Sequence, residues 1–168
     1  MPGNERNRPG QWASRFALAA AIAILTVSPG LAVEEDSNPQ DSARNPDYAA
    51  GKQAFDRKEW GEAVRRFSRA TVLDPDNADI QNYLGFSYRK MGQLELAFKY
   101  YHRALALNPR HRGAHEYIGE AYLMADNLAG AQKHLEALRN ICLLPCEELG
   151  ELQKAIAEYR AKPRAGTR

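Results

Sequence analysis

The sequence predicts an all-α fold, an α-solenoid of three helix-turn-helix repeats followed by one more helix. Small residues recur at intervals of 34 positions, in two series that contain Gly51, Gly85 and Gly119 and then Ala63, Ala97 and Ala131. A third series of large apolar residues follows each alanine by four positions and consists of Phe67, Tyr101 and Leu135. A fixed period of this length indicates stacked supersecondary units, each of which buries its apolar face only against its neighbours. Because such stacks expose an extended surface, function is expected in binding rather than in bond chemistry.

The first element along the chain is a predicted secretory signal peptide over residues 1–32. A polar start with three arginines precedes an apolar run over residues 16–27, and a Pro-Gly pair and Ala32 follow. This layout is typical of a signal peptide. As a helix the apolar run would span about 18 Å, which is short of the roughly 30 Å hydrocarbon core of a bilayer. We therefore expect export with cleavage after Ala32, and an uncleaved membrane anchor is the alternative.

The chain that this cleavage would leave has no formal net charge. Removing residues 1–32 takes three of the 23 basic and one of the 21 acidic residues, which leaves 20 of each. Binding to nucleic acid through a general basic field is disfavoured on this count, since such binding grows with the number of phosphates neutralised. Residues 33–45 are acidic and turn-forming without apolar periodicity, so they are predicted to be a flexible linker.

Three repeats are predicted to follow the linker, and their bounds are 44–77, 78–111 and 112–145. In the second repeat, Gly85 and Ala97 lack bulk and let the two helices approach closely, while Tyr101 fills the space beside them. Gly92 is expected to form the turn between these helices in the left-handed conformation, which costs little only for glycine. Pro109 cannot continue the preceding helix and is expected to end the repeat.

The second repeat carries the fullest set of patterned residues, which are Leu84, Gly85, Tyr88, Gly92, Ala97, Tyr101, Ala104 and Pro109. This set resembles the tetratricopeptide repeat, and over residues 44–145 the chain is similar to exported bacterial members of that family. The resemblance implies a right-handed α-solenoid in which the first helix of each repeat lines the concave face. Residues 146–161 have helical apolar spacing and resemble the family's capping helix, and residues 162–168 are expected to be a disordered tail.

Cys142 and Cys146 are the only cysteines in the chain, and export would place them in an oxidising compartment. Four-residue spacing within one helix sets the Cβ atoms about 5 to 6 Å apart, whereas a disulfide needs about 3.5 to 4.5 Å. Pro145 lies between them and ends the helix by about Leu144, which lets Cys146 fold back. We expect a structural disulfide. Reduced thiols packed as small apolar groups are one alternative, and redox catalysis or metal binding is another.

The histidines do not form a recognisable metal-binding motif. His111 and His115 have ligand spacing, but the residues between them lack the glutamate of the zinc protease motif. Packing alone accounts for this pair and for His102 and His134, so no metal is predicted. The sequence also lacks a nucleophile elbow, a phosphate-binding glycine loop and paired carboxylates at an identifiable cleft. We therefore expect neither catalysis nor a cofactor.

The resemblance implies a set of groove residues that lie three positions before, one after and four after each repeat glycine. These are Tyr48, Lys52, Phe55, Asn82, Phe86, Arg89, Glu116, Glu120 and Leu123, with Tyr83 and Tyr117 beside them. Five aromatic residues on a face that a monomer should leave polar are expected to be exposed binding anchors. Basic residues in the first two repeats and glutamates in the third predict a polarised groove. A solvated face with scattered aromatic residues is the alternative.

Some tetratricopeptide repeat proteins grip the C-terminal carboxylate of a chaperone tail with lysine, asparagine and arginine at five groove positions. The residues at these positions here are Tyr48, Lys52, Tyr83, Gly113 and Tyr117. Only one of them is basic, so this activity is not implied.

The sequence therefore predicts a non-catalytic, periplasmic interaction module that binds a peptide segment or helix of another cell-envelope protein. Partners of other kinds, namely nucleic acid, metal or a small-molecule substrate, are not expected. A thiol redox factor that uses the two cysteines is one alternative. A structural scaffold that self-associates through its repeat ends is the other.

Overall fold

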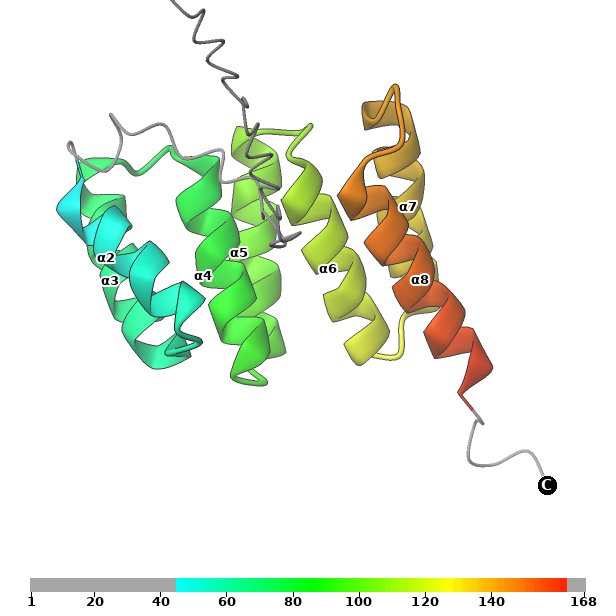
Figure 1. The fold of residues 1–168 in the computed structure, drawn as a ribbon, viewed down its shortest axis with the longest axis horizontal. Coiled ribbons are helices and arrows are strands. Elements are labelled where there is room, and N and C mark those ends of the chain that lie inside the picture. The colour runs from blue at the N-terminus through cyan, green and yellow to red at the C-terminus, as the bar shows by residue number, and fades with distance from the viewer. Residues whose placement is uncertain (1–44, 163–168) are drawn as a thin grey trace, which may run out of the picture. The chain divides into compact units, whose positions relative to one another are not determined.

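The computed structural model of the protein describes residues 45–162 (Figure 1). The predicted signal peptide, the predicted linker up to residue 44 and the tail from residue 163 lie outside the described residues. The described part of the chain contains seven α-helices and no β-strand. They are α2 (Pro46–Asp56), α3 (Trp60–Leu73), α4 (Ala78–Lys90), α5 (Leu94–Leu107), α6 (Arg112–Met124), α7 (Leu128–Ile141) and α8 (Glu147–Ala161). Within residues 45–162, none of the helices has the length and apolar character needed to cross a membrane.

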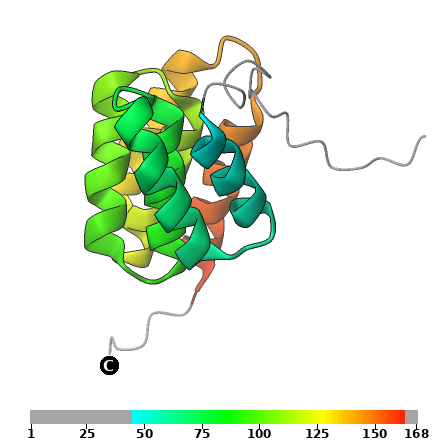
Figure 2. The same cartoon turned by 90° about the vertical axis from the view of Figure 1, so that its left-hand side faces the viewer.

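The helices pack as helix-turn-helix pairs, α2 with α3, α4 with α5 and α6 with α7, and α8 packs against α6 and α7. Figure 1 shows α2, α4, α6 and α8 side by side in one row, with α3, α5 and α7 behind them. Figure 2 shows the fold from the side, with the cyan α2 and the red α8 toward the same side. The first and the second helices therefore form two separate rows. Each second helix also contacts the first helix of the next pair, α3 with α4 and α5 with α6. The predicted all-α helical-repeat solenoid is confirmed.

Glycines in the first row let an aromatic ring of the second row lie directly against the helix backbone. A Cβ atom added to Gly51 would lie 2.7 Å from Cδ1 of Phe67, and one added to Gly85 would lie 2.6 Å from Cδ1 of Tyr101. Real Cβ atoms do not approach other heavy atoms this closely, so any larger residue must displace the ring. The 34-residue period in the sequence is thus the period of this contact.

In the third repeat, a side chain from outside the helix pair packs against the corresponding glycine. A Cβ atom added to Gly119 would lie 2.7 Å from Cδ2 of Leu152, which belongs to α8 and is fully buried. Leu135 occupies the position of Phe67 and Tyr101 in the repeat, but the side chain against the glycine comes from α8. The helix expected over residues 146–161 is therefore part of the core of the last repeat rather than a cover added outside it.

The turns between the paired helices share one backbone conformation. Gly92 has a φ of 76°, as its place in the second repeat predicted. Lys58 and Asp126 hold the same position in the first and third repeats, with φ values of 58° and 55°. Side chains with a Cβ atom rarely adopt this left-handed region, so Lys58 and Asp126 keep the conformation of the turn without the residue type that favours it.

Candidate peptide-binding face

The face formed by α2, α4, α6 and α8, here called the first-helix face, carries a continuous row of aromatic rings. Tyr48 contacts Tyr83 with ring centroids 6.3 Å apart, and Tyr83 contacts Phe55 at 5.0 Å. Phe86 continues the row, 4.8 Å from Phe55 and 4.7 Å from Tyr117. All five aromatic residues predicted for the groove are thus brought together. We call Phe55, Tyr83, Phe86 and Tyr117, which are partly buried, the aromatic row.

Tyr48 does not have the exposed position expected for a binding anchor. Only 6% of its surface is exposed, and its ring lies 6.0 Å from that of Phe67 in the core between α2, α3 and α4. The expectation that Tyr48 is an exposed anchor is therefore wrong. The physical reason is that Phe67 and Tyr83 cover this ring from two neighbouring helices, which a pattern read along one helix does not reveal.

Sequence reasoning missed Trp60, which extends the row at the start of α3. Its ring lies 5.5 Å from that of Phe55 and 5.7 Å from that of Phe86. Trp60 lies on a second helix, and groove residues were expected only on first helices. A tryptophan at the start of the second helix could have indicated a binding residue, since large amphipathic rings are frequent at binding surfaces.

Lys52 is the one basic residue at the positions used to grip a chain-terminal carboxylate. Its Nζ atom donates a hydrogen bond to the Tyr83 hydroxyl at 2.7 Å and lies 4.5 Å from the centroid of that ring. The lysine is 9% exposed. Its ammonium group is therefore held on the aromatic row by Tyr83.

Two charges of the predicted polarised groove, one cationic and one anionic, pair with each other. Nη1 of Arg89 lies 2.5 Å from Oε2 of Glu120, so a cation of the second repeat neutralises an anion of the third. The Arg89 side chain is only 8% exposed, and its Nε donates to the Tyr101 hydroxyl at 3.3 Å. The guanidinium also lies 4.9 Å from the ring centroid of Phe86, where a cation–π contact adds to the pairing.

Glu116 adds little negative charge to the groove at neutral pH. Burial, followed by the nearby carboxylates of Glu120 and Glu148, raises the pKa of this carboxyl to about 8, while Arg89 acts in the opposite direction. Glu148, which comes from α8, forms an ion pair with Arg112, with Nε and Oε1 3.3 Å apart. The sequence placed the acidic residues of α8 at a helix start and did not show that they face α6.

Asn82 was expected to offer hydrogen bonds to a partner, but it is buried. It is 4% exposed, and its Oδ1 atom has no hydrogen-bond partner among the described residues. Leu123, the last predicted groove residue, is partly buried and packs against the apolar cluster of α7 and α8. Of the predicted groove set, the partly buried aromatic rings are therefore the groups best placed to meet another protein.

The two cysteines join the ends of neighbouring helices. Cys142 follows the last residue of α7 and Cys146 precedes the first residue of α8, and their sulfur atoms form a disulfide with Cα atoms 6.0 Å apart. The helix ends at Ile141, before Pro145, so the two residues are not on one helix. This is the geometry in which four-residue spacing permits a disulfide.

The histidines make three separate kinds of contact. His111 caps α6, where its Nδ1 accepts from the Ala114 amide at 3.1 Å and its Nε2 lies 2.9 Å from Oδ1 of Asp79. His115 lies 2.9 Å from His134 through their Nδ1 atoms, a pair that the sequence did not predict. Within residues 45–162, the His, Cys, Asp and Glu side chains form no group of three or more that could hold a metal ion.

Comparison with known proteins identifies the repeats. Residues 51–92 match a family model described as TPR repeat, and residues 78–111 match one described as Tetratricopeptide repeat. A curated relative, the Protein CTR9 homolog of Arabidopsis thaliana, is 28% identical over 95 residues, which is 56% of this chain. The chain spans only 9% of the length of that relative.

Several solved structures have a similar fold. The first TPR of Spaghetti (RPAP3), bound to the HSP90 peptide SRMEEVD, has a TM-score of 0.62 and 21% identity, covering 75% of this chain and 100% of that one. The TPR2B domain of yeast Sti1, in a complex with pHsp70, has a TM-score of 0.65 and 16% identity, covering 72% and 97%. The translocator chaperone SycD of Yersinia enterocolitica has a TM-score of 0.61 and 20% identity, covering 74% and 92%.

Tetratricopeptide repeat domains are protein-interaction modules, generally without catalytic activity, and the first two structures above contain bound peptide or partner. Family models cover the first two predicted repeats in large part, and the helix-pair packing extends through the third. Residues 51–111 therefore match the tetratricopeptide repeat.

Proposed function

We propose that this protein is a non-catalytic interaction module that binds a peptide segment or helix of a partner protein on its first-helix face. The observation that carries the proposal is the aromatic row, in which four partly buried rings lie in contact across α2, α4 and α6. Each ring is held by its neighbours, so little side-chain freedom remains to be lost when a partner binds. Rigid aromatic side chains of this kind are frequent hot spots of protein interfaces.

The partner segment is expected to be recognised mainly through apolar side chains. Arg89 and Glu120 neutralise each other, and Lys52 is engaged with Tyr83. The chain-terminal carboxylate of a peptide would meet only this one basic residue at the five positions discussed above. We therefore propose an internal apolar segment as the ligand, with binding that depends weakly on salt because few unpaired charges take part.

The binding test compares two phenylalanines of similar burial. Phe86→Ala removes a ring from the aromatic row, and we expect it to weaken binding of the partner by about 1 to 2 kcal/mol. Phe98→Ala removes a phenylalanine ring from α5, where Phe98 contacts Tyr122 with ring centroids 4.7 Å apart, and should leave binding unchanged. The partner is first captured by covalent cross-linking in intact cells and identified, and its affinity for both variants is then measured by calorimetry. Equal weakening by the two variants would mean that the first-helix face is not the binding site.

We further propose that the protein is exported to the periplasm and that its partner belongs to the cell envelope. The proposal is supported by the arginine-containing start, the short apolar run and the small residues that end at Ala32. The exported protein is then expected to begin at Val33, as amino-terminal sequencing of protein from a periplasmic extract would show. A membrane-bound form that begins at Met1 or Pro2 would contradict the proposal.

A further inference from the structure

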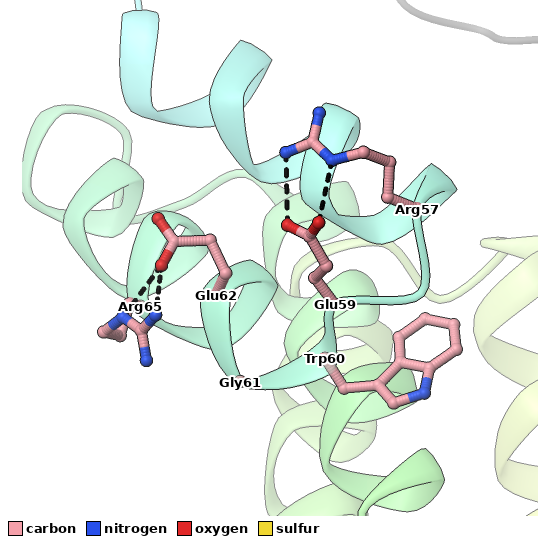
Figure 3. A pocket seen from close by; sticks show the side chains of 6 residues that line it. All are labelled: Arg57, Glu59, Trp60, Gly61, Glu62 and Arg65. Atoms are coloured by element: carbon pink, nitrogen blue, oxygen red, sulfur yellow. Dashed lines mark hydrogen bonds and ion pairs between the residues drawn. The ribbon is translucent and has the colours of Figure 1, made fainter.

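Two hollows flank Trp60 at the turn between α2 and α3. The first, shown in Figure 3, has a volume of about 590 Å³ and is bordered by Arg57, Glu59, Glu62 and Arg65. Arg57 donates to both carboxylate oxygens of Glu59 at 3.1 and 3.2 Å, and Arg65 pairs with Glu62. The Trp60 indole points away from both ion pairs. Because the four charged groups of this hollow satisfy one another, it offers a partner little.

The second hollow has a different character. It has a volume of about 290 Å³ and is lined by Phe55, Asp56, Lys58, Trp60, Phe86 and Lys90. Its three rings are in mutual contact, with centroids 4.8 to 5.7 Å apart, and form an apolar floor. Lys58 and Lys90 are exposed at its rim, and Nζ of Lys90 lies 5.2 Å from the ring centroid of Phe86. We call this hollow the aromatic cavity.

Size and charge restrict what the aromatic cavity can hold. Pockets for drug-sized ligands begin near roughly 300 Å³, so this cavity suits one or two aliphatic side chains. A cationic guest is disfavoured, because two lysines face one carboxylate at the rim and a lysine of the chain already lies over a ring. The fitting guest is an apolar side chain with a carboxylate close to it.

The chain itself presents such a segment at its other end. Leu143 and Leu144 are adjacent apolar side chains that are 92% and 80% exposed. The disulfide between Cys142 and Cys146 closes the loop that carries the two leucines, here called the leucine loop, and the exposed Glu147 follows this loop directly. A loop fixed in this way loses little conformational freedom on binding.

We propose that copies of this protein associate head to tail, with Leu143 and Leu144 of one copy in the aromatic cavity of the next. Glu147 then faces Lys58 and Lys90, which supplies the charge complementarity. The cavity lies between the first helix pair and α4, whereas the loop with the two leucines joins α7 to α8. Figure 1 shows α2 and α8 at opposite ends of the row of helices. A single copy therefore cannot bring them together. Because the two surfaces differ, the contact is heterologous, and a dimer leaves the cavity of one copy and the loop of the other free for further copies.

The proposal concerns self-association rather than peptide binding. It can therefore be wrong even if the proposed peptide binding is right. The aromatic cavity shares Phe55 and Phe86 with the aromatic row, but Lys58, Lys90, Leu143 and Leu144 are not part of the predicted groove set. Variants at these positions are therefore expected to capture the groove partner as the unchanged protein does, whatever their effect on self-association.

The test is sedimentation of the full chain over a range of concentrations. Leu143→Ser with Leu144→Ser removes the apolar loop, and Lys58→Glu with Lys90→Glu reverses the cavity rim. Each pair is expected to weaken self-association at least tenfold. All four positions are exposed, so the variants should melt as the unchanged protein does. The matched control is Val72→Ser with Leu73→Ser, which removes two other exposed apolar side chains, 80% and 64% exposed, and should have no effect.

A mixing experiment separates this arrangement from others. The loop variant keeps its cavity and the rim variant keeps its loop, so an equimolar mixture should form a dimer that grows no further. Three results would overturn the proposal. They are a chain that stays monomeric throughout, self-association that both variants leave unchanged, and a mixture that gains no dimer. A monomeric chain whose cavity binds an apolar, acidic peptide of another protein would likewise exclude a second copy as the occupant.

Discussion

Replacing Tyr101 by alanine is expected to destabilise the fold by about 4 kcal/mol, because truncating a fully buried aromatic side chain typically costs about 3 to 5 kcal/mol. Tyr101 has no exposed surface, and its ring lies against the backbone of α4 at Gly85. Single domains have a free energy of unfolding of about 5 to 15 kcal/mol. The variant should therefore unfold at a much lower urea concentration than the unchanged protein. The far-ultraviolet circular dichroism of the helices measures this unfolding.

Two further substitutions, one at Tyr101 and one at the adjacent Tyr100, test whether the loss of stability comes from the buried Tyr101 ring. Tyr101→Phe removes only the hydroxyl that accepts from Arg89, and the loss of that hydrogen bond should cost about 1 kcal/mol. Tyr100→Ala removes a partly buried ring that stacks on Tyr88, with centroids 5.3 Å apart, and should cost less than half as much as Tyr101→Ala. Equal losses for the two alanine variants would show that the contact with Gly85 does not hold the second repeat together.

A double-mutant cycle tests the contact itself. Gly85→Ala alone places a Cβ atom where Tyr101 now lies, which is expected to cost about 1 to 3 kcal/mol through overpacking. In the Tyr101→Ala background the clash is gone, so the same substitution should cost much less. The difference between the two costs is the coupling energy of glycine and ring.

The fold could be predicted because its repeating contacts lie within a short stretch of chain. Gly85 and Tyr101 belong to one helix pair, so the same spacing returns in each repeat and is visible in the sequence. The left-handed turn at Gly92 is local in the same sense. The contact of Gly119 with Leu152 was not predictable in this way, because α8 belongs to no repeat and its register against α6 has no periodic signal.

The site was predicted less well, for a related reason. Periodicity indicates which side of a helix a residue occupies, but exposure depends on the side chains that neighbouring helices place over it. Tyr48 is covered by Phe67 and Tyr83, and the charge of Arg89 is matched by Glu120. These partners lie 19 to 35 positions away in the sequence, and their pairing follows from how the helices stack.

Glu116 shows the same effect in its acid–base behaviour. It lies on α6, 9% exposed, and the carboxylates of Glu120, Glu148 and Glu151 are near enough to disfavour its ionised form. Burial is the largest cause of its raised pKa, which is about 8. In an unfolded chain a glutamate has a pKa of about 4.3. The folded protein therefore holds this proton through a pH range in which the unfolded chain releases it.

Stability should consequently fall as the pH rises from about 4.5 to about 8, because the native state binds more protons than the unfolded state in that range. Below the range Glu116 is protonated in both states, and above it the ionised carboxylate is penalised in full. His134 acts in the opposite direction, because burial lowers its pKa to about 4 and protonation of the unfolded chain at acid pH then destabilises the fold. The slope of the unchanged protein alone thus combines two effects.

Glu116→Gln isolates the glutamate, since glutamine keeps its shape without its charge. The variant should be more stable than the unchanged protein by roughly 3 to 5 kcal/mol at pH 8, since one unit of pKa corresponds to about 1.4 kcal/mol, and should match it at pH 4. Urea unfolding at both pH values measures the difference. Glu136→Gln, at an exposed position of α7 paired with Arg139, should leave the pH dependence unchanged. If Glu116→Gln gained nothing at pH 8, the carboxyl would be solvated in the folded protein, and the first-helix face would present negative charge to a partner at neutral pH after all.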